Sequence, residues 1–596
     1  MEFSMEPPLP TAKGTAVAVN LVLATSEAKK QLRLAVPLIV GCLLQSVIQM
    51  ISVMFVGHLG ELALASASMA SSFAIVTGFS FLTGMSFALD TLCGQAFGAN
   101  HDEMLGVYKQ RAMLVLGVAS IPIAAVWANT GAILLHLGQD PEIAAGAGTY
   151  IRWMVPALFF YGWLQCHVRF LQAQKLVVPV MLSSGATAVS HVLVCWALVY
   201  RLRLGIRGAA LANAVSYLTN VSILAVYVRV SPSCKKSWTG FSSEAFRDIV
   251  PFLKLAVPSA LMVCMEWWSF EVMVILSGLL PNPKLETAVL SICLNTNSLV
   301  CTVPNGLSSA ISTRVSNELG AGRPRAALLA ARVVIVLAFV VGTSEGLLLV
   351  LVHKVWGYAY SKDQEVVAYV ATMMLILAVS VLFDGLQYVL SGIVRGCGQQ
   401  KIGAFVNFIA YYLVGIPAAL VFTFKCHLGG KGLWLGILSG LVTQTLLLLV
   451  ISFGTTNWEK QHPGTPISPA VGSIADAAET AEKKLTLKSS DSKVFVVEEA
   501  VAMESQTIKH VVEDGCASNI IPLPNVNADI LEMVMNSYCK QLVQKCGADT
   551  ADPPVKTSEP DLKTFDDKFV DVDQKILFNL ILVRFPSNPP RGALCS

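Results

Sequence analysis

Two acidic residues lie inside long apolar stretches of this sequence, where charged side chains are seldom tolerated. Glu266 follows a run of apolar residues and precedes Trp267, and Asp384 lies deep in another stretch with Gln387 and Tyr388 one helical turn further on. A carboxyl group near mid-bilayer is costly, and desolvation penalises its charged form, so it can take up and release a proton. We predict that Glu266 and Asp384 form a proton-coupling and substrate site. A neutral acid hydrogen-bonded to a neighbouring helix is the structural alternative.

Two further acids in apolar stretches do not fit this site. Glu271 is five positions after Glu266, so the two side chains point about 140° apart on a helix and cannot both face one cavity. Glu345 lies near the end of its stretch, and we expect its long side chain to reach the membrane interface. The proton chemistry is therefore assigned to Glu266 and Asp384.

Neutral polar residues interrupt two other stretches and are candidates for lining a cavity. Asn295 and Asn297 lie midway along one stretch, shortly before Pro304, which predicts a helix that bends and turns polar groups inward. Gln45 and Gln49 are four residues apart and share one helix face. Because polar residues also hold helices together in lipid, packing explains both pairs equally well.

The composition is that of a membrane protein. Hydrophobic residues make up 54% of the chain and charged residues 14%, and the mean hydropathy is +0.62. Most apolar runs have the roughly 20 residues that cross the hydrocarbon, and in lipid such spans must be helices. The predicted spans are residues 34–56, 63–88, 113–135, 153–168, 176–200, 208–228, 255–279, 287–311, 333–352, 366–392, 402–424 and 432–455.

Four landmarks recur in the same order at a nearly constant spacing of 221 to 226 residues. They predict an all-α polytopic protein whose twelve helices form two pseudo-symmetric lobes of six. The repeated pairs are 33–37 with 254–258, 91–99 with 313–321, Arg169 and 174–175 with Arg395 and 400–401, and Gly205-x-x-Gly208 with Gly429-x-x-Gly432.

The two halves differ in charge although they are copies. The predicted spans of the first half contain no Asp, Glu, Lys or Arg, whereas those of the second half contain the four acids discussed above. Glu266 falls opposite Gln45, so one copy has a titratable carboxyl where the other has a neutral amide. The proton site is therefore expected in the second half.

Basic residues in the loops predict the orientation. Fifteen Lys and Arg lie in or beside the loops on the side of the N-terminus, against nine on the other side, which favours cytosolic termini. The expected organisation is a cytosolic segment 1–30, lobes at 31–230 and 247–458 joined by a loop at 231–246, a linker at 459–482, a soluble segment at 483–582 and a disordered end at 583–596.

Several function classes lack their sequence signatures. No GxxxxGK[ST] motif is present, so the energy is expected from an ion gradient, and neither a voltage-sensing arginine ladder nor a channel filter occurs. Most of the fourteen cysteines lie in apolar helices without metal or disulfide spacing. We expect a secondary transporter and not an enzyme, with no cofactor, no metal and no nucleic-acid partner.

Four motifs within residues 30 to 458 carry a family resemblance. They are the run 88–99, Pro258 with 266–268, Pro304-Asn305-Gly306 and Arg395-Gly396-x-Gly398-Gln399-Gln400. Through them the chain resembles a plant-type member of the multidrug and toxic compound extrusion (MATE) family. The resemblance implies efflux of organic solutes or xenobiotics in exchange for protons, with Glu266 and Asp384 matching the coupling acids. Many bacterial members carry an acid in the first helix where this chain has Ser52, which argues against a cation site in the first lobe.

A second resemblance is carried by the motifs at 484–491, 504–510, 521–526 and 569–574. Through them residues 483–582 resemble the N-terminal, BTB/POZ-like part of the Skp-family adaptor of cullin–F-box ubiquitin ligases. Leu485 and Leu487 alternate as in a strand, whereas 505–512 and 530–543 have helical patterns, so a small cytosolic α/β domain is expected. The resemblance implies cullin contact, but it stops near Leu582, before the helices that grip an F-box. A gene model that joins neighbouring reading frames is the alternative to a true fusion.

Three readings of function are open at this point. The first is proton-coupled antiport of organic solutes across the plasma or vacuolar membrane. The second is a sodium-coupled relative of the same superfamily. The third is a membrane-tethered ubiquitin-ligase scaffold, which would not need buried acids at Glu266 or Asp384.

Overall fold

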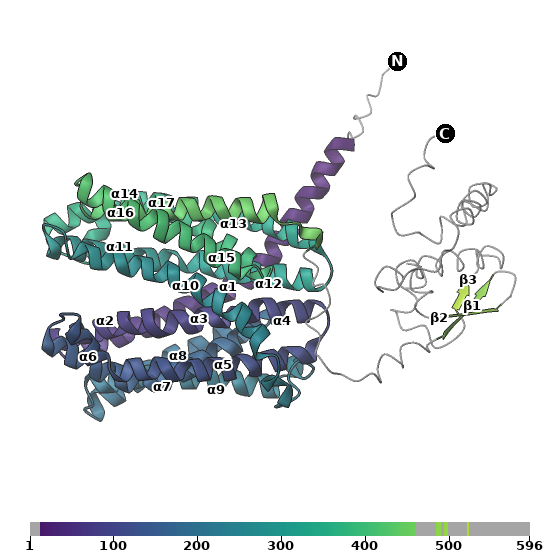
Figure 1. Ribbon diagram of the computed structural model, residues 1–596, viewed down its shortest axis with the longest axis horizontal. Coiled ribbons are helices and arrows are strands. Elements are labelled where there is room, and N and C mark those ends of the chain that lie inside the picture. Colours follow the sequence, from purple (N-terminus) through teal and green to yellow (C-terminus); the bar gives the residue numbers. More distant parts are fainter. Residues whose placement is uncertain (1–11, 461–483, 490–493, 499–520, 524–596) are drawn as a thin grey trace, which may run out of the picture. The chain divides into compact units, whose positions relative to one another are not determined.

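The computed structural model describes residues 12–460, 484–489, 494–498 and 521–523, and the chain divides into two compact units, Met1–Pro466 and Ile467–Ser596 (Figure 1). The first unit has twelve helical segments long and apolar enough to cross a membrane, as predicted. They are Val22–Gly57, Glu61–Gly98, Asp102–Ala128, Pro141–Ala173, Val178–Arg201, Ile206–Val230, Ile249–Ser277, Pro283–Gly320, Pro324–Ala359, Gln364–Gly396, Gln400–Lys425 and Gly430–Thr455.

The first six segments form one half of this unit. Several contain a short π-helical stretch or a break, so one span can comprise more than one element. The elements are α1 (Ala12–Gly57), α2 (Glu61–Ala74), η1 (Ile75–Phe79), α3 (Ser80–Ser86), α4 (Ala88–Gly98), α5 (Asp102–Ala128), α6 (Thr130–His136), α7 (Pro141–Ala173), α8 (Val178–Trp196), η2 (Ala197–Arg201) and α9 (Ile206–Val230).

The connecting loop and the second half repeat this pattern. The loop holds η3 (Pro232–Cys234) and η4 (Ser243–Phe246). The second half comprises α10 (Ile249–Ser277), α11 (Pro283–Val300), α12 (Thr302–Gly320), α13 (Pro324–Trp356), η5 (Gly357–Ala359), α14 (Gln364–Gly396), α15 (Gln400–Asn407), η6 (Phe408–Gly415), α16 (Ile416–Leu420), η7 (Val421–Lys425), α17 (Gly430–Leu449), η8 (Val450–Thr455) and η9 (Trp458–Lys460).

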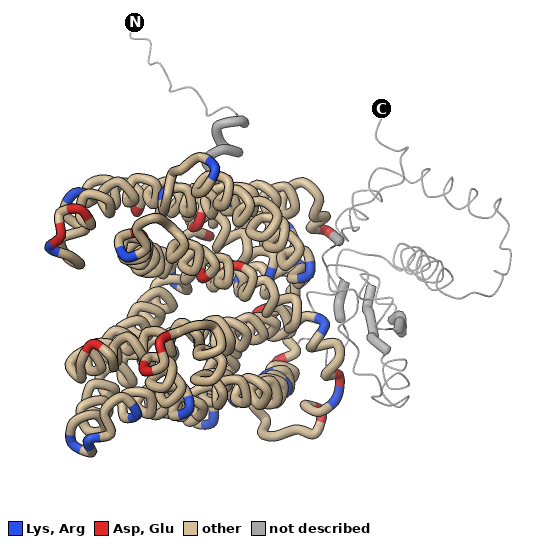
Figure 2. The backbone as a smooth tube through the Cα atoms, turned by 60° about the vertical axis from the view of Figure 1, so that its left-hand side comes forward, with Lys and Arg blue, Asp and Glu red and all other residues tan. Residues whose placement is uncertain are grey.

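The helices present apolar side chains outward, as a lipid environment requires. Val189 and Leu351 are each 73% exposed, and charged residues gather at the ends of the helices (Figure 2). Proline is accommodated inside α1, α5, α7 and α10, because the neighbouring helices of a membrane bundle can satisfy the carbonyl groups it frees. Separate buried clusters of apolar residues form the cores of the two halves.

The halves align helix by helix. The second segment, Glu61–Gly98, corresponds to Pro283–Gly320 at a spacing of 222 residues, and the ends of α7 and α14 correspond at 223. The motif that pairs Arg169 with Arg395 at a spacing of 226 is therefore displaced by three residues, nearly one helical turn, from the structural correspondence. Both arginines still face the same contact between the halves.

In the first half the helix bounds differ from the expected spans. α1 begins at Ala12, within residues 1–30. The helices also extend beyond the predicted spans, and this brings charged residues of the first half into buried positions. These are Glu27, Asp90, Lys109, Arg111 and Arg169. Hydropathy windows stop at the first charged residue, whereas a helix continues wherever its charges find partners.

The repeated Gly-x-x-Gly motif has the same role in both halves. Gly205 and Gly429 have φ angles of 54° and 59°, in the left-handed region that favours glycine, and each directly precedes a helix. The second glycine packs against the preceding span. A Cβ atom at Gly208 would lie 2.7 Å from the carbonyl oxygen of Leu198, and one at Gly432 would lie 2.6 Å from the nitrogen of Thr423.

Replacing Gly432 should therefore destabilise the second half. Gly432→Ala forces a methyl group against the backbone, and overpacking of this kind typically costs about 1–3 kcal/mol. The unfolding midpoint of the purified protein is expected to fall by several degrees. Gly454→Ala is the control, because its new Cβ would meet only Val450, at an ordinary 3.8 Å. Equal midpoints for the two variants would contradict this role.

The two halves meet mainly near the end of the bundle at which α1 begins, here called the N-terminal end. α4 packs against α12, α1 against α12, and α3 against α10. In Figure 1 the ribbons of α2 and α11 diverge from this contact toward the opposite end, and both pack within their own half.

The contact between α4 and α12 is close because it is lined by small residues. A Cβ atom at Gly98 would lie 2.1 Å from the carbonyl oxygen of Asn317, and one at Gly320 would lie 2.1 Å from that of Gln95. The two contacts are related by the 222-residue spacing, so they follow the pseudo-twofold axis. The role of these two glycines in closing the halves together was not predicted from the sequence.

The loop between the halves is anchored to the first half. The ammonium group of Lys109, buried in α5, lies 3.8 Å from the ring centroid of Trp238 and 4.8 Å from that of Phe170. Gln110 donates a hydrogen bond to the carbonyl oxygen of Gly240 at 2.8 Å. These contacts pair a charge of α5 with aromatic rings instead of an acid.

The described part of the second unit is a three-stranded sheet in the order β2-β1-β3. β1 (Lys484–Ser489) pairs antiparallel with β2 (Val494–Glu498) and parallel with β3 (Ile521–Leu523). Leu485 lies opposite Val497, and Leu487 opposite Phe495, which agrees with the predicted alternation. The helices predicted at 505–512 and 530–543, like the disordered end at 583–596, lie outside the described residues.

Candidate functional site

The two predicted acids lie on neighbouring helices of the second half and are joined through Gln387. Glu266 on α10 and Gln387 on α14 are buried, and the side-chain amide of Gln387 donates to Oε1 of Glu266 at 3.0 Å. Asp384 precedes Gln387 by one turn, is 2% exposed, and interacts with the side chains of Gln387 and Asn297. The structure therefore brings both acids into one polar cluster.

Two oxygen atoms in this cluster have no hydrogen-bond donor. Oδ2 of Asp384 and Oδ1 of Asn297 are buried and unpaired in the described structure. Buried acceptors without donors are unfavourable. A proton on the carboxyl group of Asp384 would turn one of its oxygen atoms from an acceptor into a donor. The geometry thus suits a carboxyl that alternates between charged and neutral forms.

The surroundings of the acids extend the cluster along α14. Ser391 donates to Oε1 of Gln387 at 3.3 Å, and Tyr388 lies within electrostatic range of both acids. The eighth span is interrupted at Cys301, between α11 and α12, close to where the sequence predicts a bend. Cys301 lies within electrostatic range of both acids, and Asn297, one turn before it, is buried.

Glu345 differs from the prediction. Its Oε2 atom is buried and unpaired, so the side chain does not extend to the interface, and it lies within electrostatic range of Cys301. The cause is its position on α13 (Pro324–Trp356), whose helix continues eleven residues beyond it. Glu345 is a third acidic group near the cluster that the sequence placed elsewhere.

The other candidate residues fall into separate groups. Gln49 donates to the hydroxyl group of Tyr217 at 2.9 Å, and Gln45 interacts with the same hydroxyl group, so this pair belongs to the first half. Trp267 is half-buried next to Glu266. Asn295 is exposed and does not join Asn297, because two residues along a helix turn the side chain by about 200°.

Comparison with known proteins decides the family. The MatE family model matches residues 37–197 and 258–421, one stretch in each half. Protein DETOXIFICATION 16 of Arabidopsis thaliana is 58% identical over 435 residues, which cover 73% of this chain and 89% of that protein. This chain belongs to the MATE family.

Other relatives agree with this assignment. Protein DETOXIFICATION 14 of the same plant is 46% identical over 435 residues, covering 73% of this chain and 90% of that protein. The crystal structure of the eukaryotic MATE transporter AtDTX14 matches with a TM-score of 0.72 and 45% identity, over 74% of this chain and 98% of the other.

A more distant MATE structure supports the fold alone. The outward-facing conformation of a multidrug resistance MATE family transporter of the MOP superfamily matches with a TM-score of 0.64 at 17% identity, over 73% of this chain and 96% of the other. The MATE unit is therefore an integral, multi-pass membrane protein of a family of secondary efflux transporters and not of enzymes. The Skp1 family, tetramerisation domain, matches residues 483–544.

The first half of the MATE unit contains a polar network around Ser52, the position at which many bacterial members carry an acid. Ser52 donates to Oδ1 of Asn213 at 3.0 Å and lies 2.9 Å from Nε2 of His191. His191 also lies 2.7 Å from the hydroxyl group of Ser216, and Asn213 donates to the hydroxyl group of Tyr150 at 3.1 Å. The network is internally hydrogen-bonded, which agrees with the expected departure from bacterial members.

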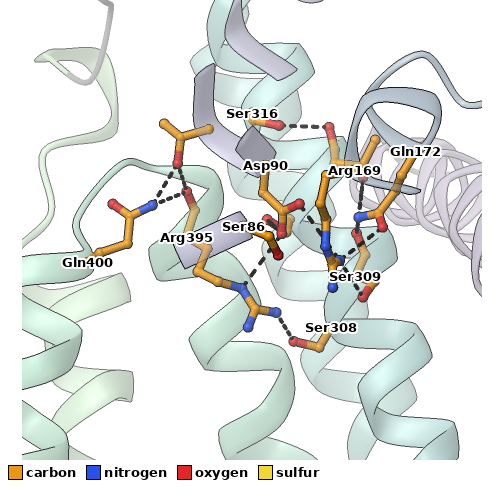
Figure 3. Close-up of polar contacts among 12 residues, drawn as sticks. Ser86, Asp90, Arg169, Gln172, Ser308, Ser309, Ser316, Arg395 and Gln400 are labelled. Carbon is orange, nitrogen blue, oxygen red and sulfur yellow. Dashed lines mark hydrogen bonds and ion pairs between the residues drawn. The ribbon is translucent and has the colours of Figure 1, made fainter. Parts of the chain in front are cut away.

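Sequence reasoning missed one group of buried charges in the MATE unit. Asp90, Arg169 and Arg395 meet where the two halves touch, and each is less than 9% exposed (Figure 3). The signal was available, because Arg169 and Arg395 belong to one repeated motif and Asp90 directly precedes another, 91–99. The two arginines were used as landmarks of the repeat, and the burial of the three residues was not considered.

Proposed function

We propose that this MATE protein exports organic solutes in exchange for protons, with Glu266 and Asp384 as the coupling acids. The observation that carries the proposal is the buried cluster in which Gln387 joins both acids, while Oδ2 of Asp384 and Oδ1 of Asn297 lack a donor. The same acidic cluster can bind either a proton or a solute, so the two compete for it. The membrane is proposed to be plasma or vacuolar, with both termini cytosolic.

The proposed cycle follows from the charge of this cluster. With Glu266 ionised and the halves open to the cytosol, the cluster and the adjacent Trp267 bind a cationic or polar amphiphilic solute. Protonation from the other side removes the negative charge and supplies the missing donor. The solute then loses its electrostatic partner and leaves, and the protonated form returns to the cytosolic side.

Purified protein in liposomes provides the test of the driving ion. A small organic cation, such as tetraethylammonium, is expected to cross the membrane in the direction opposite to the protons when a pH gradient is imposed. A sodium gradient at constant pH is expected to drive no flux. The reason is that the acidic cluster can bind a proton, whereas the network around Ser52 holds no carboxylate for sodium. A chain ending at Lys460 should transport as well as the full chain. Sodium-driven flux without a pH gradient would favour the sodium-coupled alternative.

A second activity, in the segment after the membrane spans, rests on a separate observation. The Skp1 family model matches residues 483–544, and β1, β2 and β3 form a small sheet in this region. We propose that this segment contacts a cullin, without F-box binding. A purified cullin N-terminal domain should then be retained by the immobilised full chain and not by the chain ending at Lys460. Equal retention by both would remove this activity and the scaffold hypothesis with it.

A further inference from the structure

The contact between the two halves contains a buried group of charges with one carboxylate and two guanidinium groups. Asp90 on α4 faces Arg169 on α7 of its own half and Arg395 on α14 of the other half (Figure 3). The shortest charged distances are 3.7 Å to Arg169 and 3.8 Å to Arg395. One carboxylate thus serves two guanidinium groups, at distances too long for hydrogen bonds.

The duplication explains why only one carboxylate is present. The position equivalent to Asp90, 222 residues later, is Ser312, and the hydroxyl group of Ser312 donates to Oδ2 of Asp90 at 3.3 Å. The two equivalent positions therefore meet at the pseudo-twofold axis. An acid at either position can reach the same pair of arginines, but only the first half supplies one.

Both arginines also contact neutral groups. Arg395 donates to the hydroxyl group of Ser308 at 2.8 Å, and Arg169 donates to Oε1 of Gln172 at 3.0 Å. The ring of Phe87 lies 4.4 Å from the guanidinium carbon of Arg169 and 4.0 Å from that of Arg395. Oδ1 of Asp90 and the Nε atoms of both arginines form no hydrogen bonds in the described structure. Two like charges share one ring and one carboxylate, so removing the carboxylate would leave them buried and mutually repelling.

Another ion pair between the halves shows the contrast. Arg314 on α12 makes two hydrogen bonds of 2.9 Å to the carboxylate of Glu27 on α1 and a third contact of 2.8 Å to Glu318. This group is closely paired and fully engaged. The group around Asp90 has the longer distances and the unpaired atoms, and it lies at the axis where the halves must part.

The surrounding contacts between the halves are polar. Gln172 donates to the carbonyl oxygen of Ser309 at 3.0 Å and to the hydroxyl group of Thr313 at 3.1 Å, and Gln400 donates to the hydroxyl group of Thr91 at 2.7 Å. Water can replace such hydrogen bonds when the halves separate. These hydrogen bonds can therefore be replaced by water and re-formed each time the halves open and close.

We propose that Asp90 is the positioning residue that closes the halves at the N-terminal end, by bridging Arg169 and Arg395. The proposal rests on the proposed function, since alternating access requires this end to open in each cycle. α14 carries both Asp384 and Arg395 in one continuous helix, so the proton site and the closure share an element. When the halves part, Asp90 stays with Arg169, and Arg395 moves away with α14.

The distance between the halves gives a direct test. Spin labels on genetically encoded keto amino acids at His101 and Lys401, both exposed at this end, report it in the full chain in lipid nanodiscs. The unaltered chain is expected to give a dominant short distance. Asp90→Asn should raise the ratio of separated to closed molecules by about tenfold or more, because two buried charges lose their partner. An unchanged distribution would overturn the proposal.

Relocating the carboxylate distinguishes this role from a general need for charge at this end. Asp90→Ser should separate the halves, and Asp90→Ser combined with Ser312→Asp should restore the short distance, since the acid returns to the same arginines from the other half. Failure of this rescue in a folded protein would overturn the proposal. Glu286→Gln is the matched control, because Glu286 accepts hydrogen bonds from Tyr369 at 2.8 Å and from the backbone of Gly430 at 3.1 Å within the second half, and its substitution should leave the distance unchanged.

If Asp90→Asn and Asp90→Ser do not fold, a variant that stabilises the closed arrangement provides the test. Ser312→Asp with Asp90 retained gives each arginine its own carboxylate, so the separated fraction should fall. A rise in that fraction would count against the proposal. The distances do not depend on transport: if Asp90→Asn separates the halves and the unaltered chain shows no proton-driven flux, the closure is supported and the antiport is not.

Discussion

Glu266→Gln is expected to reduce proton-driven solute flux in liposomes to the level of protein-free vesicles. The substitution keeps the shape of the side chain and an oxygen that can accept from Gln387, but it replaces the titratable carboxyl group with an amide, which takes up no proton at moderate pH. The measurement is uptake of tetraethylammonium under an imposed pH gradient. The protein should remain folded, because a neutral amide is less costly in the membrane than a carboxylate.

Glu271→Gln is the matched control for this prediction. Glu271 lies on the same helix, α10, but it is half-buried and points about 140° away from Glu266. The proton-driven flux of the Glu271→Gln variant should match that of the unaltered chain. Flux that persists in Glu266→Gln would remove Glu266 from the coupling site, and an equal loss in both variants would indicate a general need for acids on α10.

Gly98→Ala is expected to lower transport by about tenfold or more, because the halves cannot close at the N-terminal end. The added methyl group would lie 2.1 Å from the carbonyl oxygen of Asn317, and overpacking of this size typically costs about 1–3 kcal/mol. The strain acts only in the closed arrangement, so the variant should fold. The distance between labels at His101 and Lys401 should increase together with the loss of flux.

The control for this variant is Gly57→Ala at the end of α1. A Cβ atom there would have no neighbour within 4 Å. Both variants change one helical glycine to alanine, so helix propensity affects them alike. Normal flux and an unchanged distance in Gly98→Ala would show that the contact between α4 and α12 tolerates separation, and would contradict the role assigned to it.

The fold could be predicted because two signals in the sequence are direct. Hydropathy indicates which segments lie in lipid, and the internal repeat indicates that the two halves are copies. Each predicted span falls on an observed helical segment, and the pairing of halves follows the same spacing. What failed were the helix ends. Asp90 and Glu27 were placed beyond the spans because they are charged, whereas each is buried against an arginine of another helix. Partners on distant helices do not appear in a hydropathy window.

The candidate site was predicted in part for a similar reason. Acids in apolar stretches are conspicuous, so Glu266, Asp384 and the neighbouring Gln387 were found from the sequence. Asn295 and Asn297 point apart because two positions along a helix turn the side chain by about 200°, and which of the two is buried depends on how the eighth span is rotated. Glu345 was misplaced because its distance from the helix end was underestimated.

Proton release on solute binding tests the central claim most directly. If solute and proton compete for the acids of α10 and α14, adding tetraethylammonium to the purified full chain in weakly buffered detergent near neutral pH should release protons in proportion to the solute bound. Glu266→Gln combined with Asp384→Asn should release none. Solute binding without proton release in the unaltered chain, or the same release in the double variant, would contradict proton-coupled antiport through Glu266 and Asp384.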